Sequence, residues 1–151
     1  MNEPPIESRS AFRVVGIQVR AGAGGLNPPE AWAQLWPRVG EIHDQAGDGA
    51  YGVSANFDPA SGSFDCLAGV RVTSDAAPPP GMHSAFLPTQ RCAVFTCTLA
   101  TLMQVLHAAN HEWLPASAFQ RGDGPEIEWY PPAFDGADPA STFTISIPVS
   151  P

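Results

Sequence analysis

The sequence contains no lysine. All seven basic residues among its 151 residues are arginines, and 15 acidic residues bring the formal net charge to −8. Without lysine, a Schiff-base enzyme, a pyridoxal-phosphate enzyme and a phosphate-binding P-loop are excluded, because each requires that amine. The arginines form no basic stripe, and an acidic protein repels a phosphate backbone, so we expect no direct binding of nucleic acid. This charge balance attracts cations instead.

Cysteine is scarce, and the histidines complete no metal-binding motif. The three cysteines, Cys66, Cys92 and Cys97, include no C-x-x-C pair, so the sequence indicates neither a disulfide framework nor a zinc knuckle. His107 and His111 have the spacing of zinc ligands on a helix, but HAANH lacks the glutamate of the zinc-protease motif and no third ligand is evident. We therefore expect the protein to use no metal and no cofactor.

Long apolar runs are also missing. Gln104 and His107 break the longest candidate before it reaches the ~18 residues that a membrane-spanning helix needs. The N-terminal residues, MNEPPIESR, lack the apolar core of a signal peptide. We expect a cytoplasmic protein that has no membrane partner.

The composition that remains suits one folded domain. Apolar residues make up 44% of the chain and charged residues 15%, which allows a buried core and argues against disorder. The 14 glycines and 17 prolines predict many turns between short elements. We expect a tail at residues 1–11 and a single domain at residues 12–149, with halves at about 12–74 and 82–149 and a linker at 75–81.

The first half has the pattern β-α-β-β. Alternation of apolar side chains predicts a strand at residues 12–20, and Asn27 is a suitable cap for the helix that follows. Apolar residues then recur at helical spacing from Trp32 to Ile42, although Pro37 predicts a kink or break near Trp36. Two further strands, at 51–58 and 64–74, are predicted on either side of a hairpin turn.

The second half repeats this order. It has a predicted strand at 82–98 with an interruption near Pro88, a helix from Leu99 to Pro115, and strands at 126–130 and 142–149. Neither half can bury its own sheet face well alone. We therefore expect an α+β fold in which duplicated β-α-β-β halves form one antiparallel sheet with two main helices and a central cleft on a pseudo-two-fold axis.

Four segments, taken in order, resemble the GyrI-like effector-binding domain: YGVSANFD, HEWLPASAF, GPEIEWY and ISIPV. This family includes the ligand-binding parts of AraC-type and multidrug-responsive regulators as well as stand-alone members, and the resemblance covers roughly residues 12–149. It implies the duplicated fold and a central, often aromatic cleft, in which an acidic residue of the last-but-one strand faces lipophilic cations. That residue corresponds to Glu128, and Tyr51 matches the tyrosine that opens the second strand. Because no helix-turn-helix module precedes residue 12, we expect a stand-alone member.

The residues themselves lead to a similar expectation for Glu128. Side chains two positions apart share a strand face, so Glu126, Glu128 and Tyr130 point one way and Ile127 and Trp129 the other. A carboxylate within an apolar strand is costly unless a partner approaches it. Burial would raise the pKa of Glu128 and a bound cation would lower it. The alternative is that both glutamates lie on a solvated face, which we favour for Glu126.

The candidate ligand-binding residues are Glu128, Tyr130, Tyr51, Trp36 and Trp113. Because Trp32, Trp36 and Trp113 lie on helical apolar stripes, we favour core packing for at least two of these three tryptophans. The leading hypothesis is a module that binds a small, cationic, aromatic molecule, with Glu128 as counter-charge. The alternative comes from the resemblance, because some GyrI-like proteins are implicated in hydrolysing reactive cyclopropane-containing molecules. In such a hydrolase Glu128 would act as general base and Tyr51 or Tyr130 as hydrogen-bond donor or acid. A third hypothesis is an acidic surface that inhibits another protein. The sequence leaves open a regulatory protein partner and a homodimer.

Overall fold

In the computed structural model, which describes residues 3–22 and 28–151, nine strands form one antiparallel sheet. The strands are β1 (Ile6–Arg9), β2 (Phe12–Ala21), β3 (Ala50–Ala55), β4 (Phe64–Val72), β5 (His83–Leu87), β6 (Gln90–Cys97), β7 (Gln120–Arg121), β8 (Glu126–Tyr130) and β9 (Phe143–Ser150). The helices are α1 (Pro28–Leu35), a 3-10 helix (Trp36–Glu41), α2 (Leu102–Ala108), a π-helical turn (Ala109–Trp113) and α3 (Leu114–Ala116).

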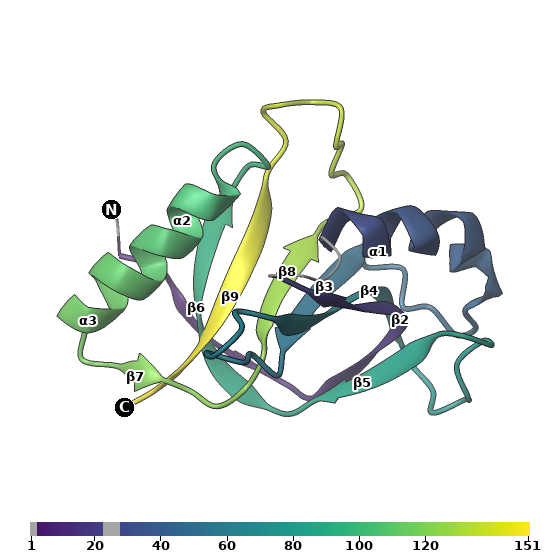
Figure 1. Ribbon diagram of the computed structural model, residues 1–151, viewed down its shortest axis with the longest axis horizontal. Coiled ribbons are helices and arrows are strands. Elements are labelled where there is room, and N and C mark those ends of the chain that lie inside the picture. The colour runs from purple at the N-terminus through teal and green to yellow at the C-terminus, as the bar shows by residue number, and fades with distance from the viewer. Residues whose placement is uncertain (1–2, 23–27) are drawn as a thin grey trace.

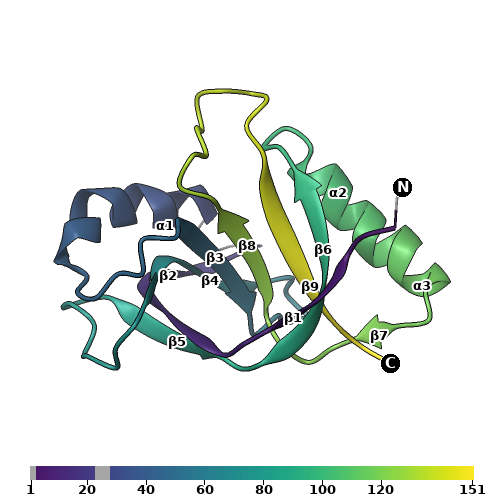
Figure 2. The same cartoon turned by 180° about the vertical axis from the view of Figure 1, so that it is seen from behind.

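The order of the strands confirms the predicted duplication. It runs β1-β6-β9-β8-β3-β4-β2-β5, and β7 pairs separately with β9. The halves β2-α1-β3-β4 and β6-α2-β8-β9 therefore meet edge to edge at the β3–β8 pair, which lies at the centre of the sheet (Figure 2). The pseudo-two-fold axis passes through this pair.

Both main helices lie over the same face of the sheet, with β8 and β9 between them (Figure 1). Beneath α1, buried Leu35 packs with residues of β2 and β4 such as Ile17 and Val70. Beneath α2 and the π-helical turn, Trp113 packs with Phe95 and residues of β9. Each helix thus buries the apolar face of its own half, while the strands at the centre remain between the two helices. Within the described residues, no helix is long and apolar enough to span a membrane.

Proline sets the end of α1. As predicted, α1 ends at Leu35 and Pro37 lies in the first turn of the 3-10 helix that follows. The predicted cap, Asn27, lies outside the described residues. Pro115 was expected to end the second helix, but α3 includes it and ends at Ala116, because proline is tolerated in a first helical turn.

The first strand, β1, was not predicted from the sequence. Residues 1–11 were expected to form a tail, yet Ile6–Arg9 form β1, which pairs with β6 of the second half. In the same way, β5, which precedes β6, pairs with β2 of the first half, so the strand that precedes each half pairs with the other half. The side chains of residues 6–8 are exposed, which leaves no apolar alternation to reveal a strand. Backbone pairing alone defines it.

The predicted linker, residues 75–81, contains no regular element and is fixed to the first half. Arg13 donates to the backbone oxygen of Ala76 at 2.9 Å, and Arg38 donates to that of Pro80 at 2.7 Å.

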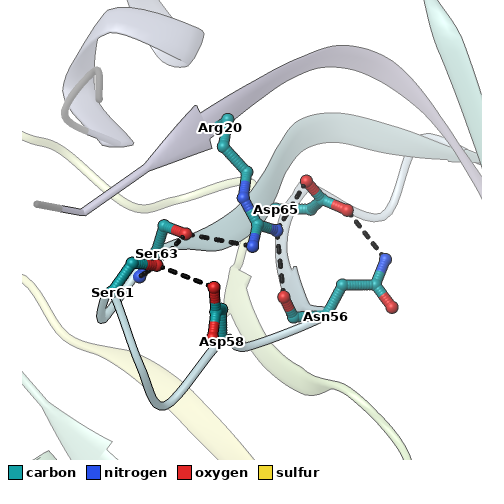
Figure 3. A network of polar contacts seen from close by, with 6 residues as sticks. All are labelled: Arg20, Asn56, Asp58, Ser61, Ser63 and Asp65. Atoms are coloured by element: carbon teal, nitrogen blue, oxygen red, sulfur yellow. Dashed lines mark hydrogen bonds and ion pairs between the residues drawn. The ribbon is translucent and has the colours of Figure 1, made fainter. Parts of the chain in front are cut away.

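At the far end of the β3–β4 hairpin, Arg20 bridges the Asp65 carboxylate at 3.0 Å and the backbone oxygen of Asn56 at 2.9 Å (Figure 3). This exposed network joins the end of β2 to the hairpin.

Candidate functional site

The β3–β8 register determines which side chains face the helices. Ala50 lies opposite Tyr130 and Gly52 lies opposite Glu128, so these four residues share one face of the sheet. That face is the one that α1 and α2 cover, since Ala68, opposite Gly52 on β4, belongs to the core beneath α1. The predicted orientation of Glu128 and Tyr130 relative to Ile127 and Trp129 therefore matches the strand.

A cavity of about 470 Å³ lies between the two halves on this face. The first half contributes the α1 region, the loop before β3, the start of β3 and one residue of β4, and the second half contributes Leu99, the end of β8 and the segment that follows it. The lining residues are Trp32, Trp36, Val39, Gln45, Gly49, Ala50, Val70, Leu99, Tyr130, Pro131, Pro132 and Phe134. The wall is thus mainly apolar, and no charged residue is among the lining residues within the described chain.

Four aromatic rings form a continuous part of this wall. Trp32 and Trp36 stack with ring centroids 5.6 Å apart, and the Trp32 ring meets that of Tyr130 edge to face at 5.2 Å. Phe134 continues the series, with its centroid 5.1 Å from that of Tyr130. Trp36 is 54% exposed although it is large and apolar, which places it at the open side of the cavity.

Gly49 permits the close approach that shapes this wall. Its φ is 101°, in the region that favours glycine, and a β-carbon there would lie 2.1 Å from the backbone oxygen of Tyr130. Another residue would push the start of β3 away from Tyr130. The absence of a side chain at Gly49 therefore allows the loop before β3 to pack directly against the backbone of Tyr130.

Glu128 is half-buried beside this wall and forms a hydrogen bond with Tyr130, one of the wall residues. The hydroxyl of Tyr130 donates a hydrogen bond to Oε1 of Glu128. Burial raises the pKa of the Glu128 carboxyl, the hydrogen bond from Tyr130 partly offsets this, and the nearby charge of Glu126 raises it further. The carboxylate is thus held close to an apolar cavity, where its charge is poorly solvated.

Two buried thiols lie in the same electrostatic environment. Burial, reinforced by the charge of Glu128, raises the pKa of Cys66 to about 11 and that of Cys97 to about 12. Both thiols stay protonated near neutral pH and are poor nucleophiles. Both therefore remain neutral and add no second negative charge beside Glu128.

Glu126 has a different environment from Glu128, although the two share a strand face. Its carboxylate forms an ion pair with Arg121 at 3.2 Å, and about a quarter of its side chain is exposed. Glu126, which was expected on a solvated face, is therefore partly buried and has a charged partner.

The prediction that Tyr51 lines the cleft was wrong. Tyr51 lies opposite Trp129 in the register, so it faces away from the helices. There it is buried against Phe12, with ring centroids 5.3 Å apart, and its hydroxyl donates to Oδ2 of Asp48 at 2.9 Å. Burial and the hydrogen bond to Asp48 both raise the pKa of the Tyr51 hydroxyl. Tyr51 thus forms part of the core on the opposite face.

Trp113 also lies outside the cavity wall. It is 8% exposed and packs edge to face on Phe95 at 5.6 Å, and its indole nitrogen donates to Glu3 at 3.2 Å. Trp32 and Phe134, by contrast, line the cavity and were not among the predicted site residues. Trp32 lies four residues before Trp36, a spacing that places two side chains next to each other on a helix. That spacing could have predicted that Trp32 joins Trp36 in the wall.

The family can now be identified from the chain as a whole. The model of the family of integron-associated effector binding proteins, Cass2, matches residues 5–149. The chain belongs to the Cass2 family. The predicted GyrI-like effector-binding domain is confirmed by this match together with the fold of its structural neighbours.

Three relatives of this Cass2 protein show how far the similarity extends. Over 150 residues it is 31% identical to the transcriptional regulator BrlR of Pseudomonas aeruginosa, covering 95% of the chain and 54% of BrlR. The chain therefore spans about half the length of that relative. Among solved structures, the integron cassette protein VCH_CASS2 of Vibrio cholerae has a TM-score of 0.68 at 20% identity, covering 99% of this chain and 97% of that one.

SAV2435, solved bound to tetraphenylphosphonium, has a TM-score of 0.74 at 17% identity, covering 99% of this chain and 94% of that chain. At these identities the two solved structures establish a shared fold. The α+β class predicted from the sequence is thereby confirmed.

Proposed function

We propose that this Cass2 protein binds a lipophilic, aromatic cation in the central cavity and that Glu128 supplies the counter-charge. The observation that carries the proposal is the position of Tyr130, whose ring lines the cavity while its hydroxyl holds the Glu128 carboxylate. One residue thereby links the aromatic wall to the negative charge. Binding of tetraphenylphosphonium by SAV2435, which shares the fold, supports a ligand of this chemistry.

Two interactions favour a cation over a neutral molecule of the same shape. The faces of the tryptophan and tyrosine rings attract positive charge, by ~0.5 to 2 kcal/mol for each ring that the cation meets. The carboxylate of Glu128, which burial destabilises, gains a partner when a cation binds. Neutral analogues obtain neither and should bind more weakly.

The biological role that we propose is the detection of such ligands. Membership of an effector-binding family and similarity to the regulator BrlR support this role. A regulatory protein or a second copy of the chain would then transmit the bound state.

Titration calorimetry with tetraphenylphosphonium tests the proposal. We expect Glu128→Gln, which keeps an acceptor for Tyr130 but removes the charge, to weaken binding by about tenfold or more. Glu126→Gln is the matched control, because it removes the same charge from the same strand face at a site paired with Arg121. That variant should weaken binding far less than Glu128→Gln does. Equal affinity of the native protein and Glu128→Gln would contradict the proposal.

The second candidate function is hydrolysis of reactive, cyclopropane-containing molecules. It is favoured by the raised pKa of Glu128, which strengthens the carboxylate as a general base. Burial and the charge of Glu128 raise the pKa of the Tyr130 hydroxyl, so Tyr130 would serve as a hydrogen-bond donor and is a weak acid. Tyr51 cannot share this task from the opposite face of the sheet. Mass spectrometry of such compounds incubated with native protein and with Glu128→Gln separates the functions. Product that disappears in the variant indicates an enzyme, whereas binding without product indicates a binding module.

A further inference from the structure

Gly52 is a glycine that neither the backbone nor strand packing requires. It lies inside β3, and its φ is outside the left-handed region that favours glycine. The other glycines inside strands, Gly16 and Gly69, face each other across β2 and β4. A β-carbon on either would lie 1.9 or 2.3 Å from the neighbouring backbone oxygen. Close approach of two backbones explains those two glycines and leaves Gly52 unexplained.

The three atoms nearest to a β-carbon at Gly52 belong to Trp32 and Glu128. The β-carbon would lie 3.5 Å from Cζ2 of Trp32, 3.5 Å from Cβ of Glu128 and 3.6 Å from Oε1 of Glu128. These are ordinary van der Waals contacts, so the backbone leaves room for about one methyl group between the indole ring and the carboxylate. A glycine inside a strand weakens the strand and often marks a place where a ligand approaches closely.

Neither Gly52 nor Glu128 is among the lining residues of the cavity, but the space over Gly52 is bordered by Trp32, which does line it. We infer that Gly52 is a specificity-determining residue beside the cavity, because its missing side chain leaves open the approach from the Trp32 ring to the Glu128 carboxylate. This inference rests on the proposed function. It adds that access to Oε1 runs over Gly52, since the Tyr130 hydroxyl already occupies another side of that oxygen. The Trp32 ring, which lines the cavity, forms the opposite side of the space.

The test compares Gly52→Ala with the native protein in titrations with tetraphenylphosphonium. We expect the added methyl group to cover Oε1 and to weaken binding by about tenfold. Thermal unfolding should occur at the same or a higher temperature, because alanine fits here without strain and restricts the unfolded chain. Gly40→Ala is the matched control, since Gly40 is exposed and its β-carbon would point into open space.

A double variant ties the effect to the charge. In the Glu128→Gln background, Gly52→Ala should weaken binding by less than about threefold, because the contact that the methyl group blocks is already lost. Native affinity in Gly52→Ala would overturn the inference, as would a clearly lowered unfolding temperature, which would mean that packing requires the glycine. If the native protein binds and Glu128→Gln does not, the proposed function holds whatever Gly52→Ala does. If the native protein binds no tetraphenylphosphonium, the proposed function and this inference both fail.

Discussion

Tyr130 donates its hydroxyl hydrogen bond to the carboxylate of Glu128, two residues back on the same face of β8. The bond joins a ring of the cavity wall to a carboxyl whose pKa burial raises. Under the proposed function, a cation that enters the cavity beside Tyr130 meets an aromatic surface with the Glu128 carboxylate behind it. Proton binding and cation binding at Glu128 should consequently compete.

The first prediction is a pH dependence of ligand affinity. The pKa of Glu128 is raised from its ordinary value of 4.5, so between 4.5 and the raised value the folded protein keeps a proton that cancels the charge. Affinity for tetraphenylphosphonium, which does not titrate, should rise with pH through this window by at most about tenfold per pH unit, and then level off. Calorimetry across the pH range in which circular dichroism shows a folded protein measures this. Glu128→Gln should give a flat profile, and a rising profile in that variant would assign the effect to another group.

The second prediction concerns Tyr130→Phe, which keeps the ring and removes the hydrogen bond. Since that bond lowers the pKa of Glu128, its loss should raise the pKa. The midpoint of the affinity profile should therefore move to higher pH. The same titration series in the variant measures the shift. An unchanged midpoint would mean that the hydroxyl does not stabilise the carboxylate.

The third prediction separates the two tryptophans that the sequence placed together in the site. Trp36→Ala removes a half-exposed ring from the cavity wall, so ligand affinity should fall by about threefold to tenfold with little change in stability. Trp113→Ala empties part of the core beneath the second helix and should cost about 3 to 5 kcal/mol of unfolding free energy. Chemical denaturation and ligand titration of both variants measure these effects. A Trp113→Ala protein with native stability and weakened binding would reverse the assignment.

The fourth prediction concerns β1. Deleting residues 1–10 removes the pairing with β6 and the hydrogen bond of 3.0 Å from Arg9 to the fully buried hydroxyl of Ser146. We expect a loss of about 1 to 3 kcal/mol of unfolding free energy, since a buried hydroxyl loses its donor and β6 loses a neighbour. Denaturation of the shortened chain measures the loss. Stability equal to that of the full chain would mean that residues 1–10 behave as the tail expected from the sequence.

Local patterns were enough to predict β8 and the direction of its side chains. Alternation along one strand fixes which residues share a face, so Glu128 and Tyr130 were placed together correctly. The face that Tyr51 takes depends instead on the register between β3 and β8, which are more than 70 residues apart in the chain. No pattern within residues 51–58 specifies that register.

The tryptophans show the same limit on the helices. Trp32, Trp36 and Trp113 all follow helical spacing, and spacing alone does not distinguish a core position from a cavity wall. The difference arises because α1 ends at Leu35 and leaves Trp36 exposed, whereas Trp113 packs in the core with Phe95 and Phe119. Helix ends and neighbouring elements, which are tertiary properties, decide the outcome.

The most direct measurement is a crystal structure of the protein grown with tetraphenylphosphonium. We expect the cation in the central cavity, with its phenyl rings against Trp32, Trp36 and Phe134 and with Glu128 as the acidic side chain closest to phosphorus. A cation bound elsewhere on the protein, or one in the cavity with a different carboxylate nearest to it, would contradict the assignment of Glu128 as the counter-charge.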